Sequence, residues 1–97
     1  MIVITSSNNS ITIKGHANYA AYGKDIVCAA ISALTQTMLE SVEKLTPDTI
    51  KYSMSPGTVD IKFRNLSEKA QLLVDSFFIG AQMIAEAYPK SVTLTKL

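Results

Sequence analysis

The sequence is poor in the residues that build cross-linked and metal-bound proteins. In 97 residues it has one cysteine, one histidine and no tryptophan. The single Cys28 cannot close a disulfide within the chain. One cysteine and one histidine also fall short of the three or four protein ligands that a zinc site uses. We therefore exclude a disulfide scaffold and a zinc module, and we expect neither a metal nor a cofactor.

Charge of one sign and long apolar runs are also scarce. Nine basic residues against eight acidic ones leave a formal charge of +1, so no strong field attracts nucleic acid or anionic lipid. Only three consecutive apolar residues follow Met1, without a basic stretch, which is far short of a signal peptide or a membrane span. We expect a reduced, cytoplasmic domain with no membrane partner and no direct nucleic-acid partner.

The chain does hold enough apolar residues for one core. Apolar residues make up 47% and charged residues 18% of the chain, which is typical of a globular protein. This length suffices for one two-layer core and is too short for two independently stable halves. No repeat or low-complexity linker divides the sequence, so residues 1–97 are predicted to form a single domain.

Apolar residues alternate at the beginning of the chain and then change to helical spacing. Alternation over 2–4 and 11–14, on either side of a polar run, predicts a β-hairpin. Over 26–45 the apolar residues recur every three or four positions, which predicts a helix of about five turns. Asp25 stands at its N-cap position, and Pro47 follows its end. Because the first half of this helix is apolar nearly all round, we expect its N-terminal end to be the buried end.

A second hairpin and a second helix follow. Alternation over 50–54 and 59–63, joined by a turn containing Pro56 and Gly57, predicts a second hairpin with one apolar, buried face and one face in solvent. Ser67 can cap a helix that continues to Pro89, and a short last strand begins near Val92. The order β-β-α-β-β-α-β predicts an α+β two-layer sandwich, with a largely antiparallel sheet and two long helices.

The connection between the second strand and the first helix runs for ten residues from Gly15, which is long for a domain of this size. Gly15 and Gly23 lie at or near its ends and supply the backbone freedom of hinges, so the segment is predicted to act as a lid. Tyr19 and Tyr22 either stack on a substrate or anchor the loop. His16 lies at the start of this segment, and the only cysteine follows its end.

The position of Cys28 suits a nucleophile. If Asp25 is the N-cap, Cys28 is the third helical residue, where free backbone N–H groups and the helix dipole favour the thiolate. His16, carried back over this helix end by the loop, can share the thiol proton and later protonate a leaving amine. The unpaired N–H groups of the helix, including that of Cys28, can accept the oxyanion of a tetrahedral intermediate.

Each of these residues also has a purely structural alternative. Cys28 can be a small core residue, and His16 can be a polar loop residue. Asp25 either caps the helix or orients the His16 ring, and its negative charge opposes a thiolate three residues away. Ser32, one turn beyond Cys28, can donate a hydrogen bond to the thiolate or to the backbone carbonyl of Cys28.

One stretch of the sequence resembles a known family. Gly15-His16-Ala17 is followed, twelve residues after its histidine, by the cysteine of Asp25-Ile26-Val27-Cys28-Ala29-Ala30, and then by Ser32-Ala33-Leu34. This pattern, over about a fifth of the chain, resembles the signature of the ribosomal-processing cysteine proteases called Prp. The resemblance implies that Cys28 is the nucleophile and His16 the general base.

The same resemblance implies a substrate. Members of this family are bacterial cytoplasmic endopeptidases and homodimers. They remove a short N-terminal extension from the twenty-seventh protein of the large ribosomal subunit. Cleavage follows an aromatic residue of a hydrophobic stretch. We therefore expect a ribosomal protein precursor as the peptide substrate.

Two classes of function stay open on the sequence. One is this Cys-His endopeptidase, and the alternative is a noncatalytic homodimeric module that binds a ribosomal protein or its peptide without cutting it. An RNA-contacting ribosome factor is disfavoured by the charge. A dimer is favoured because the second helix has apolar residues beyond one face, namely Leu72, Phe77, Phe78 and Ile79.

Overall fold

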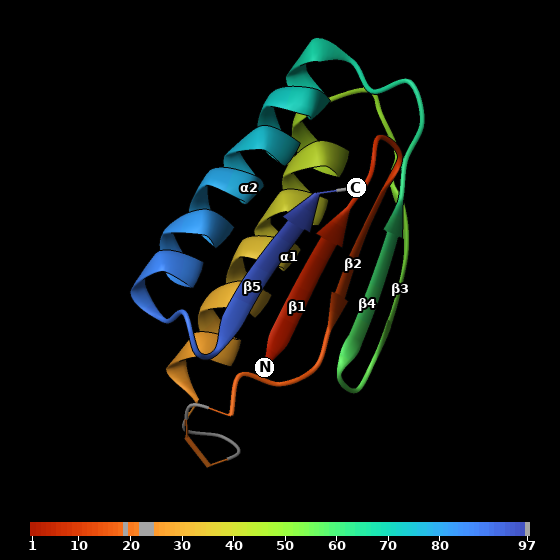
Figure 1. The fold of residues 1–97 in the computed structure, drawn as a ribbon. Coiled ribbons are helices and arrows are strands. Elements are labelled where there is room, and N and C mark those ends of the chain that lie inside the picture. Colours follow the sequence, from red (N-terminus) through yellow and green to blue (C-terminus); the bar gives the residue numbers. More distant parts are fainter. Residues whose placement is uncertain (19, 22–24, 97) are drawn as a thin grey trace.

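The structure, a computed structural model, describes residues 1–18, 20–21 and 25–96. Two helices lie side by side against one face of a five-stranded sheet (Figure 1). The order of elements is β1 (Ile2–Ser6), β2 (Ser10–Lys14), α1 (Ile26–Leu45), β3 (Lys51–Ser55), β4 (Thr58–Lys62), α2 (Glu68–Ala87) and β5 (Val92–Lys96). The predicted α+β sandwich and its β-β-α-β-β-α-β order are confirmed.

The sheet is antiparallel except at one pair of strands. The strand order is β3-β4-β2-β1-β5, and β1 pairs with β5 in parallel while all other neighbours are antiparallel. Ile4 of β1 stands opposite Ile13 of β2 and opposite Leu94 of β5. The first and last strands of the chain are therefore neighbours, with β5 at one edge of the sheet and β1 next to it (Figure 1).

The core lies between the sheet and the helices. Alternate residues of the strands point into it, which is why the apolar alternation of the sequence matches the strands. The fully buried side chains include Ile4, Ile11, Ile61, Val27, Val42, Val74 and Val92. The opposite face of the sheet has no helix over it, and Val3 on that face is 39% exposed.

The two helices begin and end where the sequence predicts. Asp25 caps α1 and Ser67 caps α2, each accepting hydrogen bonds from backbone N–H groups of the first turn. From the sequence, the N-terminal end of α1 was expected to be the buried end. That expectation was wrong, because this end is not more deeply buried than the rest of the helix. Its buried residues divide evenly between the halves, with Val27, Ile31 and Thr35 in the first and Met38, Leu39 and Val42 in the second. The reason is that α1 packs along its whole length, and its outward residues, such as Ile26 at 56% exposure, remain in solvent.

Strand β3 differs from the expectation of an apolar buried face. All five of its residues are exposed, and Tyr52 and Met54 are 52% and 47% exposed. It is one of the two edge strands of the sheet, on the side away from α2 (Figure 1), so no second layer covers it fully. Met54 is consequently available to line a surface pocket.

Among the described residues, neither helix is long and apolar enough to cross a membrane.

Candidate active site

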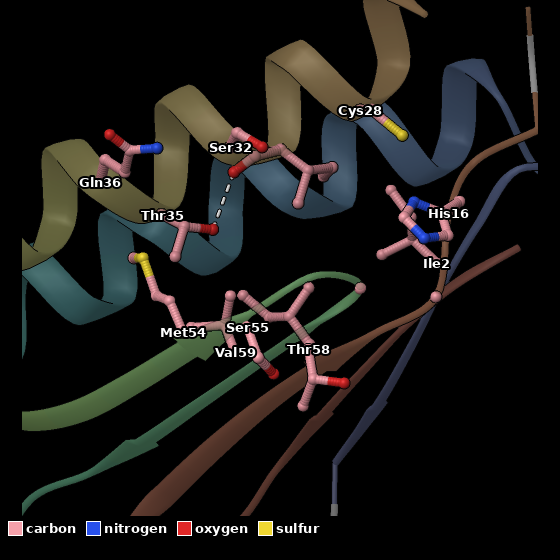
Figure 2. A pocket seen from close by; sticks show the side chains of 14 residues that line it. Ile2, His16, Cys28, Ser32, Thr35, Gln36, Met54, Ser55, Thr58 and Val59 are labelled. Carbon is pink, nitrogen blue, oxygen red and sulfur yellow. Dashed lines mark hydrogen bonds between the residues drawn. The ribbon is translucent and has the colours of Figure 1, made fainter. Parts of the chain in front are cut away.

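The structure brings the only histidine and the only cysteine of the chain to one pocket. Cys28 lies in the first turn of α1, and His16 follows Gly15 at the exit from β2. Both line a pocket of about 230 Å³ between α1 and the β3–β4 hairpin. Figure 2 shows the Cys28 thiol and the His16 ring at the same end of this pocket. Cys28 is half-buried and His16 is exposed, so both are within reach of a ligand.

Asp25 holds the start of α1 through two backbone donors. Its Oδ1 accepts hydrogen bonds from the N–H groups of Val27 and Cys28, both at 3.0 Å. Its Oδ2 accepts from the N–H of Ala20 at 3.4 Å and so connects the loop to the helix end. The helix-cap alternative is confirmed, whereas orientation of His16 by Asp25 stays a prediction.

These cap bonds correct one expectation from the sequence. The N–H of Cys28 was expected to be unpaired and free for an oxyanion, but it donates to Asp25. The cause is that a side-chain cap satisfies the same first-turn N–H groups that an anion would use. The helix end therefore offers fewer donors than its position alone suggests.

A different backbone donor contacts the sulfur. The N–H of Ala17 donates a hydrogen bond to Cys28 Sγ over 3.3 Å. Ala17 is only 3% exposed, so its backbone is held by packing beside the helix. The sequence carries no local signal for this contact, since it joins residues that are eleven positions apart.

Gly15 is required by a close backbone approach. It has φ +96, and a Cβ at this position would collide with the carbonyl oxygen of Met1. Its N–H donates to the carbonyl oxygen of Gly57 over 2.8 Å. The positive φ and the close contact explain a glycine here, and its role as a hinge stays a prediction.

Gly57 belongs to the site and was not singled out beyond its turn. It has φ +73, and a Cβ built on it would lie 3.1 Å from His16 Nε2. The turn between β3 and β4 thus packs its backbone against the imidazole ring. The Pro56-Gly57 pair predicted a turn, but only the tertiary fold shows that the turn meets His16.

The rest of the pocket is mostly apolar and comes from both layers. Ser32 lies one turn beyond Cys28 and lines it, as expected of a site residue. Within the described residues, the Ser32 hydroxyl donates neither to Cys28 Sγ nor to the backbone carbonyl of Cys28. Residues that the sequence did not single out complete the lining (Figure 2), namely Ile2, Ile13, Ile31, Thr35, Gln36, Met54, Ser55, Thr58 and Val59.

A second hollow adjoins the first at the same residues. It has a volume of about 500 Å³ and is lined by Asn18, Ala20, Asp25 and Ala29 together with His16, Cys28 and Ser32. His16, Cys28 and Ser32 therefore stand where two hollows meet. An extended chain lying across both would pass over the sulfur.

Tyr19, Tyr22 and Gly23, which were predicted to belong to the lid, lie outside the described residues.

Sequence comparisons find one family. A family model described as cysteine protease Prp matches residues 1–93. A relative from Mycoplasma genitalium, named ribosomal processing cysteine protease Prp, is 33% identical over 98 residues, which are 99% of this chain and 96% of the relative. A relative of the same name from Staphylococcus aureus is 32% identical over 88 residues, which are 87% of this chain and 82% of the relative.

Solved structures share the fold. A crystal structure of a Streptococcus mutans protein matches with a TM-score of 0.83 at 30% identity, covering 99% of this chain and 91% of that one. The essential ribosomal processing protease Prp of Staphylococcus aureus, solved with a covalently linked product peptide, matches with a TM-score of 0.96 at 24% identity and covers 100% of both chains. The same protein was also solved with a substrate peptide.

Proposed function

Because the chain belongs to the cysteine protease Prp family, we propose that it removes the N-terminal extension from the precursor of the twenty-seventh large-subunit ribosomal protein. The protein is a cysteine protease that acts in ribosomal protein processing. The observation that carries the proposal is that Cys28 and His16 line one pocket. With one cysteine and one histidine in the chain, the nucleophile and the base each have a single candidate.

The proposed reaction uses these two side chains in turn. The thiolate of Cys28 attacks the scissile carbonyl carbon, and the electron pair of the C=O bond moves onto oxygen. When the intermediate collapses, the C–N bond breaks and the His16 imidazolium gives its proton to the departing amine. Water then attacks the thioester while His16 takes one of its protons, and cleavage of the S–C bond returns the thiolate and releases the new carboxylic acid, which loses its remaining proton to solvent.

The two hollows suit a peptide that crosses the sulfur. The pocket beneath α1 is lined by apolar side chains from Ile2, Ile31, Met54 and Val59, and it suits the hydrophobic stretch of the extension, whose burial there is favourable. The second hollow, beneath Asn18 and Ala20, takes the residues after the scissile bond. Ser32 borders both hollows and is proposed to contact the peptide. The peptide-bound structures of the Staphylococcus aureus relative support this class of ligand.

We further propose that residues 1–97 work as one protease domain in the cytoplasm and that two copies form a homodimer. The extent of the family match, residues 1–93, supports a single domain. A role in ribosomal protein processing supports a location in the cytoplasm. The exposed apolar residues of α2 support a dimer, since Leu72, Ile79 and Met83 are 70%, 66% and 65% exposed.

The test is cleavage of a peptide that spans the extension and the mature start of the ribosomal protein, followed by mass spectrometry. We expect cut products with the unchanged protein and none with Cys28→Ala or His16→Ala. Ser41→Ala, on the same helix but away from the pocket, is the matched control and should cut at the normal rate. Binding of the peptide without any product would support the noncatalytic module instead, and full activity of Cys28→Ala or His16→Ala would overturn the mechanism.

A further inference from the structure

The proposed reaction develops negative charge at Cys28, and a backbone N–H can stabilise that charge. The N–H of Cys28 was the expected donor, but it is already bonded to Asp25. Charge sits first on the thiolate and then on the oxyanion of the tetrahedral intermediate. In the first turn of α1, the N–H groups of Val27 and Cys28 are both engaged by Asp25 Oδ1 at 3.0 Å. Using either for an oxyanion would require breaking the cap, which stabilises a helix by about 0.5–2 kcal/mol.

One described backbone donor is instead aimed at the reacting atom. The N–H of Ala17 lies 3.3 Å from Cys28 Sγ. The backbone is fixed before and after Ala17 in the sequence. Gly15 is hydrogen-bonded to Gly57, and Asn18 adopts a left-handed backbone with φ 55. Ala17 itself is almost fully buried, so the donor is held in place before substrate arrives, which is the condition for effective charge stabilisation.

We propose that the backbone N–H of Ala17, and not that of Cys28, is the donor that stabilises the reacting charge. It donates to the thiolate before attack and to the oxyanion bonded to the adjacent carbon after attack. A charged acceptor forms a shorter and stronger hydrogen bond than a neutral thiol does, so the contact strengthens as charge develops. His16 supplies the proton for the leaving amine, and Ala17 supplies the N–H that stabilises the negative charge. Proton transfer and charge stabilisation therefore come from two adjacent residues. The inference rests on the proposed role of Cys28 as nucleophile.

A backbone N–H can be removed without changing the side chain, and this chain is well suited to the experiment. The only cysteine, Cys28, allows a synthetic peptide of residues 1–27 to be joined at the natural sequence to a recombinant peptide of residues 28–97. L-lactic acid in place of Ala17 turns the peptide bond into an ester and deletes the N–H while keeping the methyl group. The all-amide protein made in the same way is the reference. Lactic acid in place of Ala21, which is exposed on the same loop, is the matched ester control.

Two readouts separate this inference from the proposed function. Alkylation of Cys28 by iodoacetamide, followed against pH, needs no protease activity, and the Ala17 ester should move its midpoint to higher pH. Peptide cleavage should fall by about 10²-fold in kcat with little change in KM, as for loss of one oxyanion donor. If the all-amide protein does not cut peptide, the proposed function is wrong and the alkylation profile still tests the donor. An alkylation profile and a kcat matching those of the Ala21 ester would overturn the inference.

A measurement on the unchanged chain covers the case in which the ester protein does not fold. In ¹⁵N-labelled protein, the amide proton of Ala17 should move downfield as pH is raised and the thiol ionises. The same titration of Cys28→Ala keeps the contribution of His16 and should lose this movement. An Ala17 amide proton that titrates identically in both proteins would exclude a hydrogen bond to the thiolate and overturn the inference.

Discussion

At the scale of single residues, the site depends on backbone positions as much as on the two reactive side chains. Ala17 places an N–H on the sulfur, and Gly15 and Gly57 are joined by a hydrogen bond of 2.8 Å. Both glycines have positive φ, a conformation that costs other residues about 1–2 kcal/mol. Glycine at these positions therefore lets residue 15 approach the backbone of Met1 and lets the β3–β4 turn approach the His16 ring.

Gly57→Ala should lower activity through His16. The new Cβ would lie 3.1 Å from His16 Nε2, so the ring must shift by a few tenths of an ångström. A displaced base costs rate steeply, and we expect kcat/KM for peptide cleavage to fall on the order of tenfold. Alkylation of Cys28 should be affected less than peptide cleavage, because iodoacetamide needs no proton donor for a leaving amine.

The matched control for this change is Asn65→Ala. Asn65 also has a positive φ, 49, is exposed and lies between β4 and α2, so its substitution introduces similar backbone strain away from the pocket. Both variants should lose stability in thermal unfolding, while only Gly57→Ala should lose activity. Equal kcat/KM in the two variants would show that contact with the His16 ring is unimportant.

At the scale of elements, α1 and its cap determine where the cysteine stands. Asp25 fixes the first turn through Val27 and Cys28 and ties the loop to it through Ala20. The helix end and the loop are thus held by one carboxylate. Substitutions of Asp25 can therefore separate its role as a helix cap from a role of its negative charge.

Asp25→Ala and Asp25→Asn are expected to differ in stability. The alanine variant loses the cap and should be destabilised by about 1 kcal/mol, which lowers the unfolding temperature by roughly 4–8 °C in a domain of this size. The asparagine variant keeps an oxygen acceptor and should unfold near the normal temperature, because asparagine is a favoured N-cap residue.

Activity of the asparagine variant then tests the role of the charge. If the cap is the whole role of Asp25, Asp25→Asn should keep its kcat/KM within a few-fold. A large loss of kcat in a variant that unfolds normally would show that the carboxylate acts beyond the cap, either by holding the loop at Ala20 or by orienting His16, which is the alternative raised by the sequence.

The elements themselves were largely predictable, and the contacts between them were not. Both helices carry local signals at each end, such as Asp25 and Pro47 for α1 and Ser67 and Pro89 for α2. The meeting of Cys28 with Ala17, and of His16 with Gly57, depends on segments that approach only in the folded chain. Strand β3 shows the same limit, because alternation over 50–54 cannot tell an edge strand from a covered one.

At the scale of the whole molecule, the outer face of α2 is an apolar surface left uncovered, with three large apolar side chains that are each at least 65% exposed. Leu72, Ile79 and Met83 are spaced by seven and four positions and so lie on one face of the helix. They lie opposite its buried residues, which are Ala70, Val74, Phe77 and Ala81. Phe77, expected on the sequence to add to the exposed surface, is 3% exposed and belongs to the core. Leu72 and Ile79 are exposed as the dimer hypothesis requires.

Ile79→Lys should therefore weaken a homodimer. Light scattering at micromolar concentration should give twice the monomer mass for the unchanged protein and a lower mass for the variant, because a buried unpaired charge opposes association. Gln71→Lys, exposed on the same helix but away from this face, adds the same charge and should leave the mass unchanged. A monomeric mass for the unchanged protein would contradict the proposed dimer.

The pairing of β1 with β5 has a consequence for the order of events during synthesis. A ribosome releases the chain from its N-terminus, so β1 and β2 emerge early, but one edge of β1 stays unpaired until residues 92–96 follow. The amide of Ile2 also bonds to the carbonyl of Ser91 over 2.8 Å, and Gly15 packs against Met1. The segment carrying His16 thus lies beside a strand that pairs with β2 along one edge and needs β5 along the other. We infer that a nascent chain acquires its cutting geometry only after residues 92–96 have left the ribosome and paired with β1.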